Sequence, residues 1–279
     1  MRSYPCIRIS PSMTRRPMSR LMGYLLFFLS ITTIISGCDS LPKEADKTQD
    51  WSAGQLYEEA KQERKVGNYM KAIDYYQKLE SRYPFGRYAQ QAQLETIYTY
   101  YKADEPDLAI ASADRFMKLY PRHEHVDYAH YIRGITNFDL GKGPLDQYLP
   151  VDPSQRDPGA ALHAFQDFGE LIERFPESKY APDARQRMLY LRNNLAKYEV
   201  HVANYYLRRK AYIACANRGK YVIEHYQGAP AVADALVIMA KAYKLLGTEE
   251  LSEEALRVLE FNFPDHPGIA EVKAMVPEK

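Results

Sequence analysis

Residues 72–84 read AIDYYQKLESRYP: a small residue and, twelve positions later, a proline that follows an aromatic residue. The same spacing occurs five times, once with glutamine in place of proline. The sets are Ala72 and Pro84, Ala109 and Pro121, Ala164 and Pro176, Cys215 and Gln227, and Ser252 and Pro264. Proline cannot donate to the helical ladder and biases its predecessor away from helical geometry. Each aromatic–Pro pair therefore predicts the end of a helix.

Each unit is predicted to be a pair of packed helices. The small residue lies on the second helix, and twelve positions upstream four units have Ala60, Ile97, Ala203 or Ala240, the expected contact on the first helix. The outer spacings between closing residues are 37, close to the roughly 34-residue period of tetratricopeptide repeats. The sequence thus predicts an all-α, tetratricopeptide-repeat-like α-solenoid of about five helix pairs. A chance recurrence in an ordinary helical bundle is the alternative.

The predicted helices are 56–66, 69–83, 89–102, 106–120, 127–140, one ending at 175, 212–226, 232–246 and 251–263. The two middle spacings are longer, 55 and 51 residues. The Gly- and Pro-containing stretch 141–157 predicts a long loop, after which Asp157 serves as the N-cap and Pro158 as the first helical residue. One uninterrupted helix over 182–209 is expected to link the two halves.

The first 37 residues have the pattern of a signal peptide. Five arginines and no acidic residue accompany a mostly apolar run, 21–37, which is shorter than the roughly 20 residues that span a bilayer. The run ends in Ile35-Ser36-Gly37-Cys38, which resembles the bacterial lipobox and predicts Cys38 as the lipid anchor. An ordinary signal peptide with a chance cysteine is the alternative. Residues 38–50 are polar and predict a flexible tether.

Charge and cysteine content restrict the function. Loss of the leader's five arginines leaves 32 basic against 36 acidic residues. Nucleic-acid binding requires a clustered excess of Lys and Arg, so no nucleic-acid partner is predicted. Cys215 occupies the small-residue position of its unit, which predicts a packing role rather than a reactive thiol.

Catalytic motifs are weak. The cluster of His123, Glu124, His125, Asp127 and His130 follows a helix-ending proline and lacks a helical His pair with metal-binding spacing. The sequence contains no phosphate-binding glycine loop and no nucleophile elbow. We therefore predict no enzyme activity, no metal and no cofactor apart from the covalent lipid on Cys38. A repeat surface that holds other polypeptides is expected instead.

Several segments are more specific than the repeat positions. They are Asn68-Tyr69, Ala72-Ile73, Tyr76-Gln77, Leu79-Glu80, RYPFG at 82–86, Tyr88-Ala89, YYK at 100–102, DRF at 114–116, Asp127-Tyr128, Tyr131, Arg133-Gly134, Asn137, RDP at 156–158 and LAKYE at 195–199. Together, over nearly the whole mature chain, they resemble the BamD (ComL/YfiO) family of outer-membrane β-barrel assembly lipoproteins.

The resemblance implies a scaffold lipoprotein on the periplasmic face of the outer membrane, which assists recognition, folding and insertion of outer membrane proteins. Its implied partners are the periplasmic domains of BamA, the other lipoproteins of the complex and unfolded β-barrel substrates. The C-terminal repeats, 183–279, would dock on BamA, and the N-terminal repeats, 51–182, would accept substrate. The family's Asn-Arg pair matches Asn217 and Arg218, and its arginine is associated with coupling to BamA. A solvated arginine on a helix face is the alternative.

Repeat geometry gives candidate substrate residues on the first helices of the first three units. They are Tyr57, Lys61, Arg64, Tyr98, Tyr101 and Tyr131. Tyrosine offers a large apolar body with a polar tip, and Lys or Arg receives a peptide carboxylate. This chemistry suits barrel proteins, which commonly end in an aromatic residue with a free carboxylate. Packing between helices is the alternative for any one tyrosine.

Two other functions remain open from the sequence. The first is a peptidoglycan-associated repeat lipoprotein involved in competence or cell-wall organisation, and the second is an enzyme built on a repeat scaffold. Asp39 departs from the expected pattern, because aspartate after the lipid cysteine tends to retain lipoproteins at the inner membrane of enteric bacteria.

Overall fold

The computed structural model describes residues 46–143 and 152–276. Contacts divide the chain into Met1–Asp50 and Trp51–Lys279. Of the first unit only 46–50 are described, a turn in which the Asp46 carboxylate accepts hydrogen bonds from the backbone and hydroxyl of Thr48. The predicted signal peptide and the lipidation site Cys38 lie outside the described residues.

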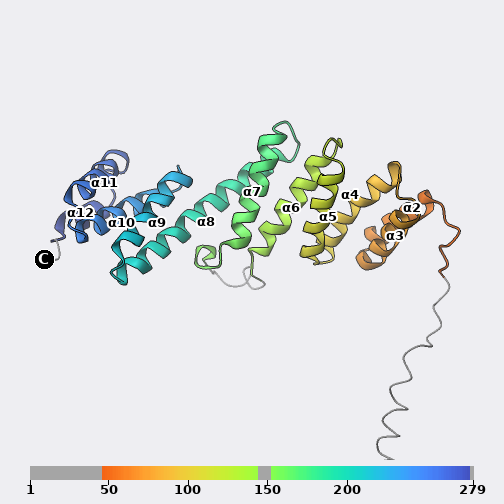
Figure 1. Cartoon of the computed structure of the whole chain (residues 1–279), viewed down its shortest axis with the longest axis horizontal. Helices are drawn as coiled ribbons and strands as arrows, with labels where there is room; N and C mark the ends of the chain where they lie inside the picture. The colour runs from red at the N-terminus through yellow and green to blue at the C-terminus, as the bar shows by residue number, and fades with distance from the viewer. Residues whose placement is uncertain (1–45, 144–151, 277–279) are drawn as a thin grey trace, which may run out of the picture. The chain divides into compact units, whose positions relative to one another are not determined.

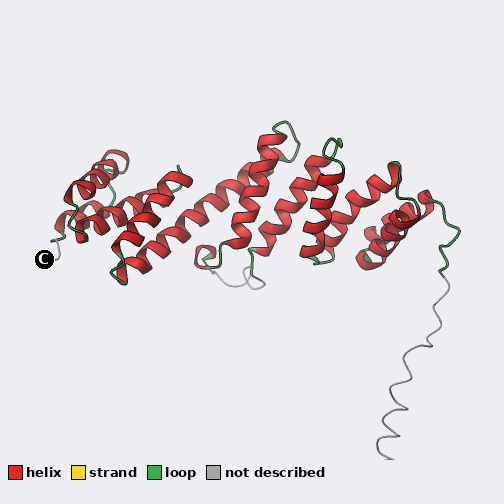
Figure 2. Ribbon diagram, viewed as in Figure 1, coloured by secondary structure: helices red, strands yellow, loops and turns green. Residues whose placement is uncertain are grey.

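In the described part of the second unit the regular secondary structure is entirely helical. The helices follow one another as five pairs (Figures 1 and 2). The pairs are α2 (Ala53–Lys65) with α3 (Tyr69–Arg82), α4 (Arg87–Lys102) with α5 (Pro106–Leu119), α6 (Val126–Leu140) with α7 (Gly159–Arg174), α8 (Ala181–Arg208) with α9 (Tyr212–His225), and α10 (Val232–Leu245) with α11 (Glu249–Asn262). A short α12 (Gly268–Ala274) follows. The predicted repeat of helix pairs is confirmed.

The aromatic residue of each repeated set ends the second helix of its pair. Tyr83, Tyr120, Phe175, Tyr226 and Phe263 are the five C-cap residues, with φ between −138° and −124° and ψ between 43° and 63°. Each backbone N–H still donates to the carbonyl four residues earlier. The chain therefore leaves all five helices through nearly the same geometry, including the one where glutamine replaces proline.

The small residues lie where the two helices of a pair meet. Ala72, Ala109, Ala164 and Cys215 are completely buried, and Ser252 is nearly so. The Ser252 hydroxyl donates a 2.9 Å hydrogen bond to the carbonyl of Ala240, the predicted contact twelve positions earlier. Burial raises the pKa of the Cys215 thiol to about 11, as expected for a packed rather than reactive cysteine.

The hydrophobic core is a series of clusters, each shared by consecutive helices. One joins Leu56 of α2 to α3 and the start of α4, and another joins Leu195 of α8 to Cys215 of α9 and Ile238 of α10. The last combines Leu236 of α10 with residues of α11 and α12. No pair buries its apolar faces alone, so each repeat depends on its neighbours for stability.

Helix α8 spans 28 residues and confirms the long helix predicted over 182–209. It packs on both α7 and α9. The predicted boundary between N-terminal and C-terminal repeats falls in its first turn and stays a prediction.

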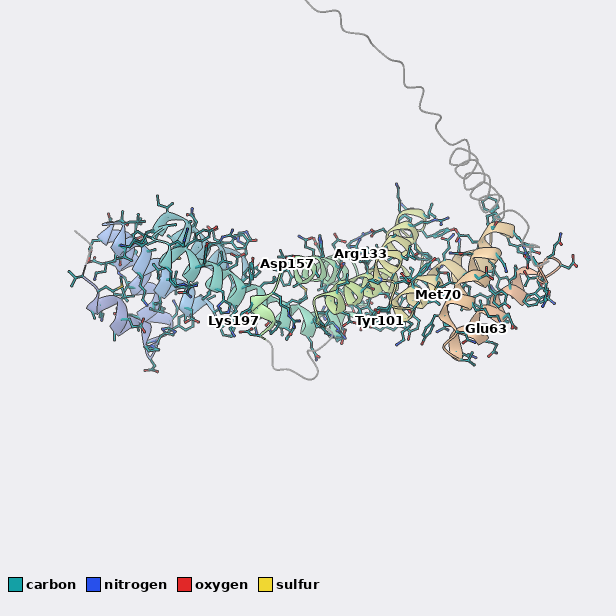
Figure 3. All side chains as sticks on the ribbon, turned by 90° about the horizontal axis from the view of Figure 1, so that it is seen from below. Glu63, Met70, Tyr101, Arg133, Asp157 and Lys197 are labelled. Atoms are coloured by element: carbon teal, nitrogen blue, oxygen red, sulfur yellow. The ribbon has the colours of Figure 1, made fainter. Side chains whose placement is uncertain are left out.

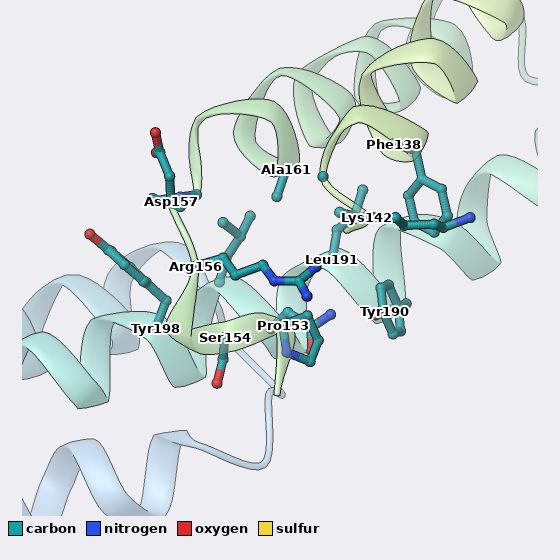
Figure 4. Close-up of a pocket in the computed structure, with 14 residues that line it drawn as sticks. Phe138, Lys142, Pro153, Ser154, Arg156, Asp157, Ala161, Tyr190, Leu191 and Tyr198 are labelled. Carbon is teal, nitrogen blue, oxygen red and sulfur yellow. The ribbon is translucent and has the colours of Figure 1, made fainter. Parts of the chain in front are cut away.

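The end of the long connection before α7 is attached to α8. Lys197 Nζ donates to Asp152 Oδ2 at 2.6 Å, and His201 Nε2 lies 3.1 Å from the hydroxyl of the buried Ser154. A small cavity of about 50 Å³ at this junction is lined by Phe138, Leu191, residues 153–154 and residues 156–158, among others (Figure 4). Residues 152–158 are thus packed against the helix rather than detached from it.

The predicted start of α7 is wrong by one residue. Pro158 is the N-cap and the helix begins at Gly159. The Asp157 carboxylate accepts a 2.9 Å hydrogen bond from the Gly159 N–H from one position further out. Aspartate therefore satisfies a free N–H at the helix start, but as part of a turn that precedes the cap.

An ionic network ties α5, α6 and α7 together around the half-buried Arg133, which is labelled in Figure 3. Arg133 Nη1 donates to Asp114 at 2.7 Å, and Nη2 lies 2.8 Å from both Asp167 and Glu170. His130, one turn earlier, is almost completely buried. Burial, followed by the charges of Arg133 and Arg174, lowers its pKa to about 4. The network therefore holds a neutral histidine beside fixed charges.

Gly134→Ala tests how tightly α6 and α7 meet. A Cβ at position 134 would lie 2.7 Å from the buried Phe168 ring, whereas one at Gly169, also helical, would meet only Met188 at 3.7 Å. We expect Gly134→Ala to destabilise the fold by about 1–3 kcal/mol in denaturant unfolding. Gly169→Ala is the control and should be neutral or stabilising, because alanine favours helix by about 1 kcal/mol. Equal stabilities for the two variants would contradict this packing.

His130→Gln tests the network's response to pH. The unfolded chain protonates His130 near pH 6.5 but the native chain only near pH 4, so the unfolded state binds more protons between these values. Native stability should therefore fall as pH is lowered from about 6.5 to 4. Thermal unfolding at pH 7 and pH 5 should show a smaller fall in His130→Gln, by up to about 2 kcal/mol. The exposed His163→Gln is the control, and identical pH dependence in all three proteins would refute the assignment.

Candidate functional site

The first helices of neighbouring pairs are joined by polar contacts of the predicted substrate residues. Arg64 of α2 lies 3.4 Å from the Glu95 carboxylate of α4, and its guanidinium is 5.7 Å from the centre of the Tyr98 ring. The Tyr101 hydroxyl of α4 donates to Asp139 of α6 at 2.7 Å. The structure thus brings residues of separate repeats together along one series of helices.

The series continues from α6 to α8. The Tyr131 hydroxyl donates to Asp183 Oδ2 at 2.8 Å, and its ring stacks on Tyr180 with ring centres 4.5 Å apart. We call the aromatic side chains of this series the tyrosine row; it comprises Tyr57, Tyr98, Tyr101, Tyr128, Tyr131 and Tyr180. The row is contributed by α2, α4, α6 and the residue that caps α8.

At the α2 end of the row, Tyr57 and the neighbouring Lys61 differ in how accessible their side chains are. Tyr57 is 9% exposed and packs between the rings of Tyr76 and Tyr88, and burial raises its pKa. Lys61 is half-buried, with Nζ 5.9 Å from the centre of the Tyr57 ring and 3.9 Å from Glu58. Lys61 is therefore more available to a ligand than Tyr57.

The hydroxyl groups of Tyr101 and Tyr131 are already committed to carboxylates. Burial, followed by the hydrogen bond to Asp183, raises the pKa of Tyr131 to about 12. Burial and Asp139 raise the pKa of Tyr101 in the same way (Figure 3). Both rings remain half-buried. A ligand at these two tyrosines would therefore meet their ring surfaces rather than free hydroxyl groups.

Three members of this surface were missed from the sequence: Tyr128, Tyr180 and Arg187. Tyr128 lies three residues before Tyr131, a spacing that places both on one helix face, so a signal for it was present. Tyr180 is 49 residues beyond Tyr131 and gave no such signal. Arg187 is held by Asp183 at 2.6 Å, and its guanidinium lies 4.8 Å from the centre of the Phe138 ring.

The second candidate region is on α9. Arg218 Nη1 donates to Glu199 Oε2 of α8 at 2.9 Å. The Arg218 side chain is 42% exposed, the Glu199 side chain only 10%. Burial lowers the pKa of Arg218, but Glu199 and Tyr206 more than offset this, so that the guanidinium stays charged. Asn217 is exposed beside it.

The helix that carries Arg218 is fixed by close packing. A Cβ at the next residue, Gly219, would lie 2.5 Å from Met239 and 3.0 Å from the Ala235 carbonyl of α10. The backbone at Arg218 therefore has little freedom to move relative to α10.

Neither a metal site nor a membrane span emerges from the described residues. Across 46–143 and 152–276, no group of three His, Cys, Asp or Glu side chains is arranged to hold a metal ion. The His123 ring packs on Phe116, whereas the His130 ring packs on Phe175. Within the same ranges, no helix combines the length and apolar character needed to cross a membrane.

Comparison with known proteins relates the chain to one family. The profile of the family described as "YfiO: Outer membrane lipoprotein" matches residues 49–259. "Outer membrane protein assembly factor BamD" of Neisseria meningitidis serogroup B (strain ATCC BAA-335 / MC58) is 45% identical over 253 residues, 90% of this chain and 95% of that protein. The protein of the same name from Vibrio cholerae serotype O1 (strain ATCC 39315 / El Tor Inaba N16961) is 38% identical over 82% of this chain and 94% of its own.

A solved tetratricopeptide repeat protein from Parabacteroides merdae ATCC 43184 aligns with 91% of this chain and 96% of its own, at 16% identity and a TM-score of 0.38. The relatives' names fit the assembly-factor interpretation and not the cell-wall alternative. Because the profile covers most of the sequence and the relatives match over nearly their full length, this chain belongs to the YfiO family of outer membrane lipoproteins.

Proposed function

We propose that this chain is an outer membrane protein assembly factor: a scaffold lipoprotein, anchored by a lipid on Cys38 at the periplasmic face of the outer membrane. The observation that carries the proposal is the 45% identity to a protein of that name over 95% of its length. The series of helix pairs supports it, since such arrays offer extended surfaces for holding other proteins. The role needs no catalysis and no cofactor besides the lipid.

Docking on the periplasmic domains of BamA is assigned to the region around Asn217 and Arg218. The guanidinium is partly exposed and charged, and it lies on a helix whose backbone is fixed against α10. An arginine presented in this way forms strong charge-assisted hydrogen bonds with a carboxylate of a partner. The other lipoproteins of the complex complete the assembly.

Unfolded β-barrel substrates are assigned to the tyrosine row and its flanking cations. The row combines half-buried ring surfaces with Lys61, Arg64 and Arg187. Rings and cations suit a peptide that ends in an aromatic residue with a free carboxylate. Arg64 already pairs with Glu95, so Lys61 is the cation that a carboxylate reaches with less competition.

Arg218→Glu tests the docking region. Reversal of the charge should reduce recovery of BamA at least about fivefold in affinity purification from detergent-solubilised envelope, because a carboxylate of the partner would meet a like charge. Lys220→Glu is the matched control: it makes the same charge change two residues away on α9, at an exposed position. Circular dichroism should show unchanged helicity. Wild-type recovery with Arg218→Glu would remove this residue from the interface, and absence of any β-barrel partner with the wild-type chain would reject the function.

Lys61→Glu combined with Arg64→Gln tests substrate acceptance. Glutamine is used at 64 because a glutamate there would face Glu95 and disturb the fold. Fluorescence titration with a peptide that ends in an aromatic residue and a free carboxylate should show binding weakened about tenfold by loss of the charge contacts. Lys65→Glu, at an exposed position of the same helix, is the control. Amidating the peptide should have a similar effect on the wild-type chain; equal binding of both peptides would contradict carboxylate recognition.

A further inference from the structure

We propose that Glu199 is a positioning residue, which holds Arg218 ready to receive a carboxylate of the docking partner. The inference rests on the proposed docking through Arg218. Glu199 is the last residue of the segment LAKYE at 195–199, and it lies outside the proposed docking residues Asn217 and Arg218. Its carboxylate is nearly buried and accepts the 2.9 Å hydrogen bond from Arg218 Nη1.

Glu199 does not enclose the Arg218 side chain. Arginine has five N–H donors in a planar fork. Arg218 Nη1 donates to Glu199, Tyr206 is a second hydrogen-bond partner of the guanidinium, and 42% of the Arg218 side chain is still exposed. A single guanidinium can therefore keep its bond to Glu199 and donate to a second carboxylate that approaches from the exposed side of Arg218.

Both members of the pair are placed by packing rather than by each other. Neighbouring residues on α8, Ala196 and Val200, belong to the same buried cluster as Cys215 of α9. Gly219 fixes α9 against α10. The distance between the two helices is therefore set before the side chains meet, and Glu199 selects one conformation of Arg218.

This arrangement favours binding by limiting disorder in the free protein. A long, rotamer-rich side chain loses conformational freedom when it is immobilised at an interface, which lowers affinity. Glu199 removes much of that loss, because Arg218 is already ordered. The opposing effect is partial neutralisation of the Arg218 charge by Glu199, but the nearly buried Glu199 leaves the more exposed Arg218 as the group that a partner carboxylate meets.

Glu63 provides a matched comparison within the same chain. Its side chain is 11% exposed, close to the 10% of Glu199, and its carboxylate bonds to Lys71 of the following helix (Figure 3). The two pairs thus share burial and a first-helix-to-second-helix arrangement. Only the pair in the fourth repeat includes a proposed docking residue.

The test measures affinity of the full chain for purified BamA periplasmic domains by titration calorimetry. Glu199→Gln should weaken binding about threefold to tenfold, the range expected for one disordered side chain. Glu63→Gln, the control, should bind like the wild type. In the Arg218→Gln background, Glu199→Gln should cause no further loss, because there is no arginine left to position.

The outcomes separate this inference from the proposed function. If Arg218→Gln binds like the wild type, docking through Arg218 fails and the inference fails with it. If Arg218→Gln weakens binding but Glu199→Gln does not, docking stands and positioning is overturned. An additive loss in the double variant also overturns it, because it shows a general structural effect. Thermal unfolding checks that each variant is folded. If Glu199→Gln is unfolded, Glu199→Asp replaces it, because aspartate retracts the carboxylate from Arg218. Glu199→Asp should then give the same loss of affinity, and wild-type affinity would overturn the inference.

Discussion

The whole structure depends on the close approach of two helices at a small residue in each pair. Ala72, Ala109, Ala164, Cys215 and Ser252 are buried at this point, and the hydrogen bond from Ser252 to the Ala240 carbonyl shows how near the backbones come. A larger side chain would separate the helices, since protein interiors are packed too densely to absorb added volume. The aromatic C-cap that follows then turns the chain in nearly the same way each time, so the next pair begins in a similar direction and its helices meet at the equivalent small residue.

Polar interactions decide how successive pairs are held once the apolar contacts have formed. Arg133 connects α5, α6 and α7 through three carboxylates, and the hydroxyl groups of Tyr101 and Tyr131 join first helices to the next. Arg133, Asp167 and the two tyrosines are buried or half-buried, where an unpaired charge or donor is costly. Each contact therefore specifies one arrangement of neighbouring repeats, which an apolar contact alone would specify less strictly.

The candidate binding regions reuse these structural contacts. In the tyrosine row the hydroxyl groups of Tyr101 and Tyr131 bond to Asp139 and Asp183, which leaves the ring surfaces and the cations beside them for a ligand. Arg218 on α9 also combines a structural contact with a proposed binding role. Glu199 accepts a hydrogen bond from one of its donors, and the exposed part of the Arg218 side chain stays available to a partner. Recognition on this scaffold thus depends on side chains that the fold has already oriented, which favours affinity because less freedom is lost on binding.

The sequence by itself determined the helix pairs, their ends and the buried small positions, because these follow from local spacing, proline chemistry and helical periodicity. It also determined the family through segments such as RYPFG at 82–86. It did not determine that Tyr180 stacks on Tyr131, that Asp183 and Asp139 take the tyrosine hydroxyls, or that Glu199 holds Arg218. It also placed the start of α7 one residue early, since Asp157 and Pro158 are compatible with two neighbouring caps. Only the tertiary structure decided the contacts of Tyr101, Tyr131 and Arg218, because they join residues 19 to 52 positions apart, whose distance is set by how whole helices pack.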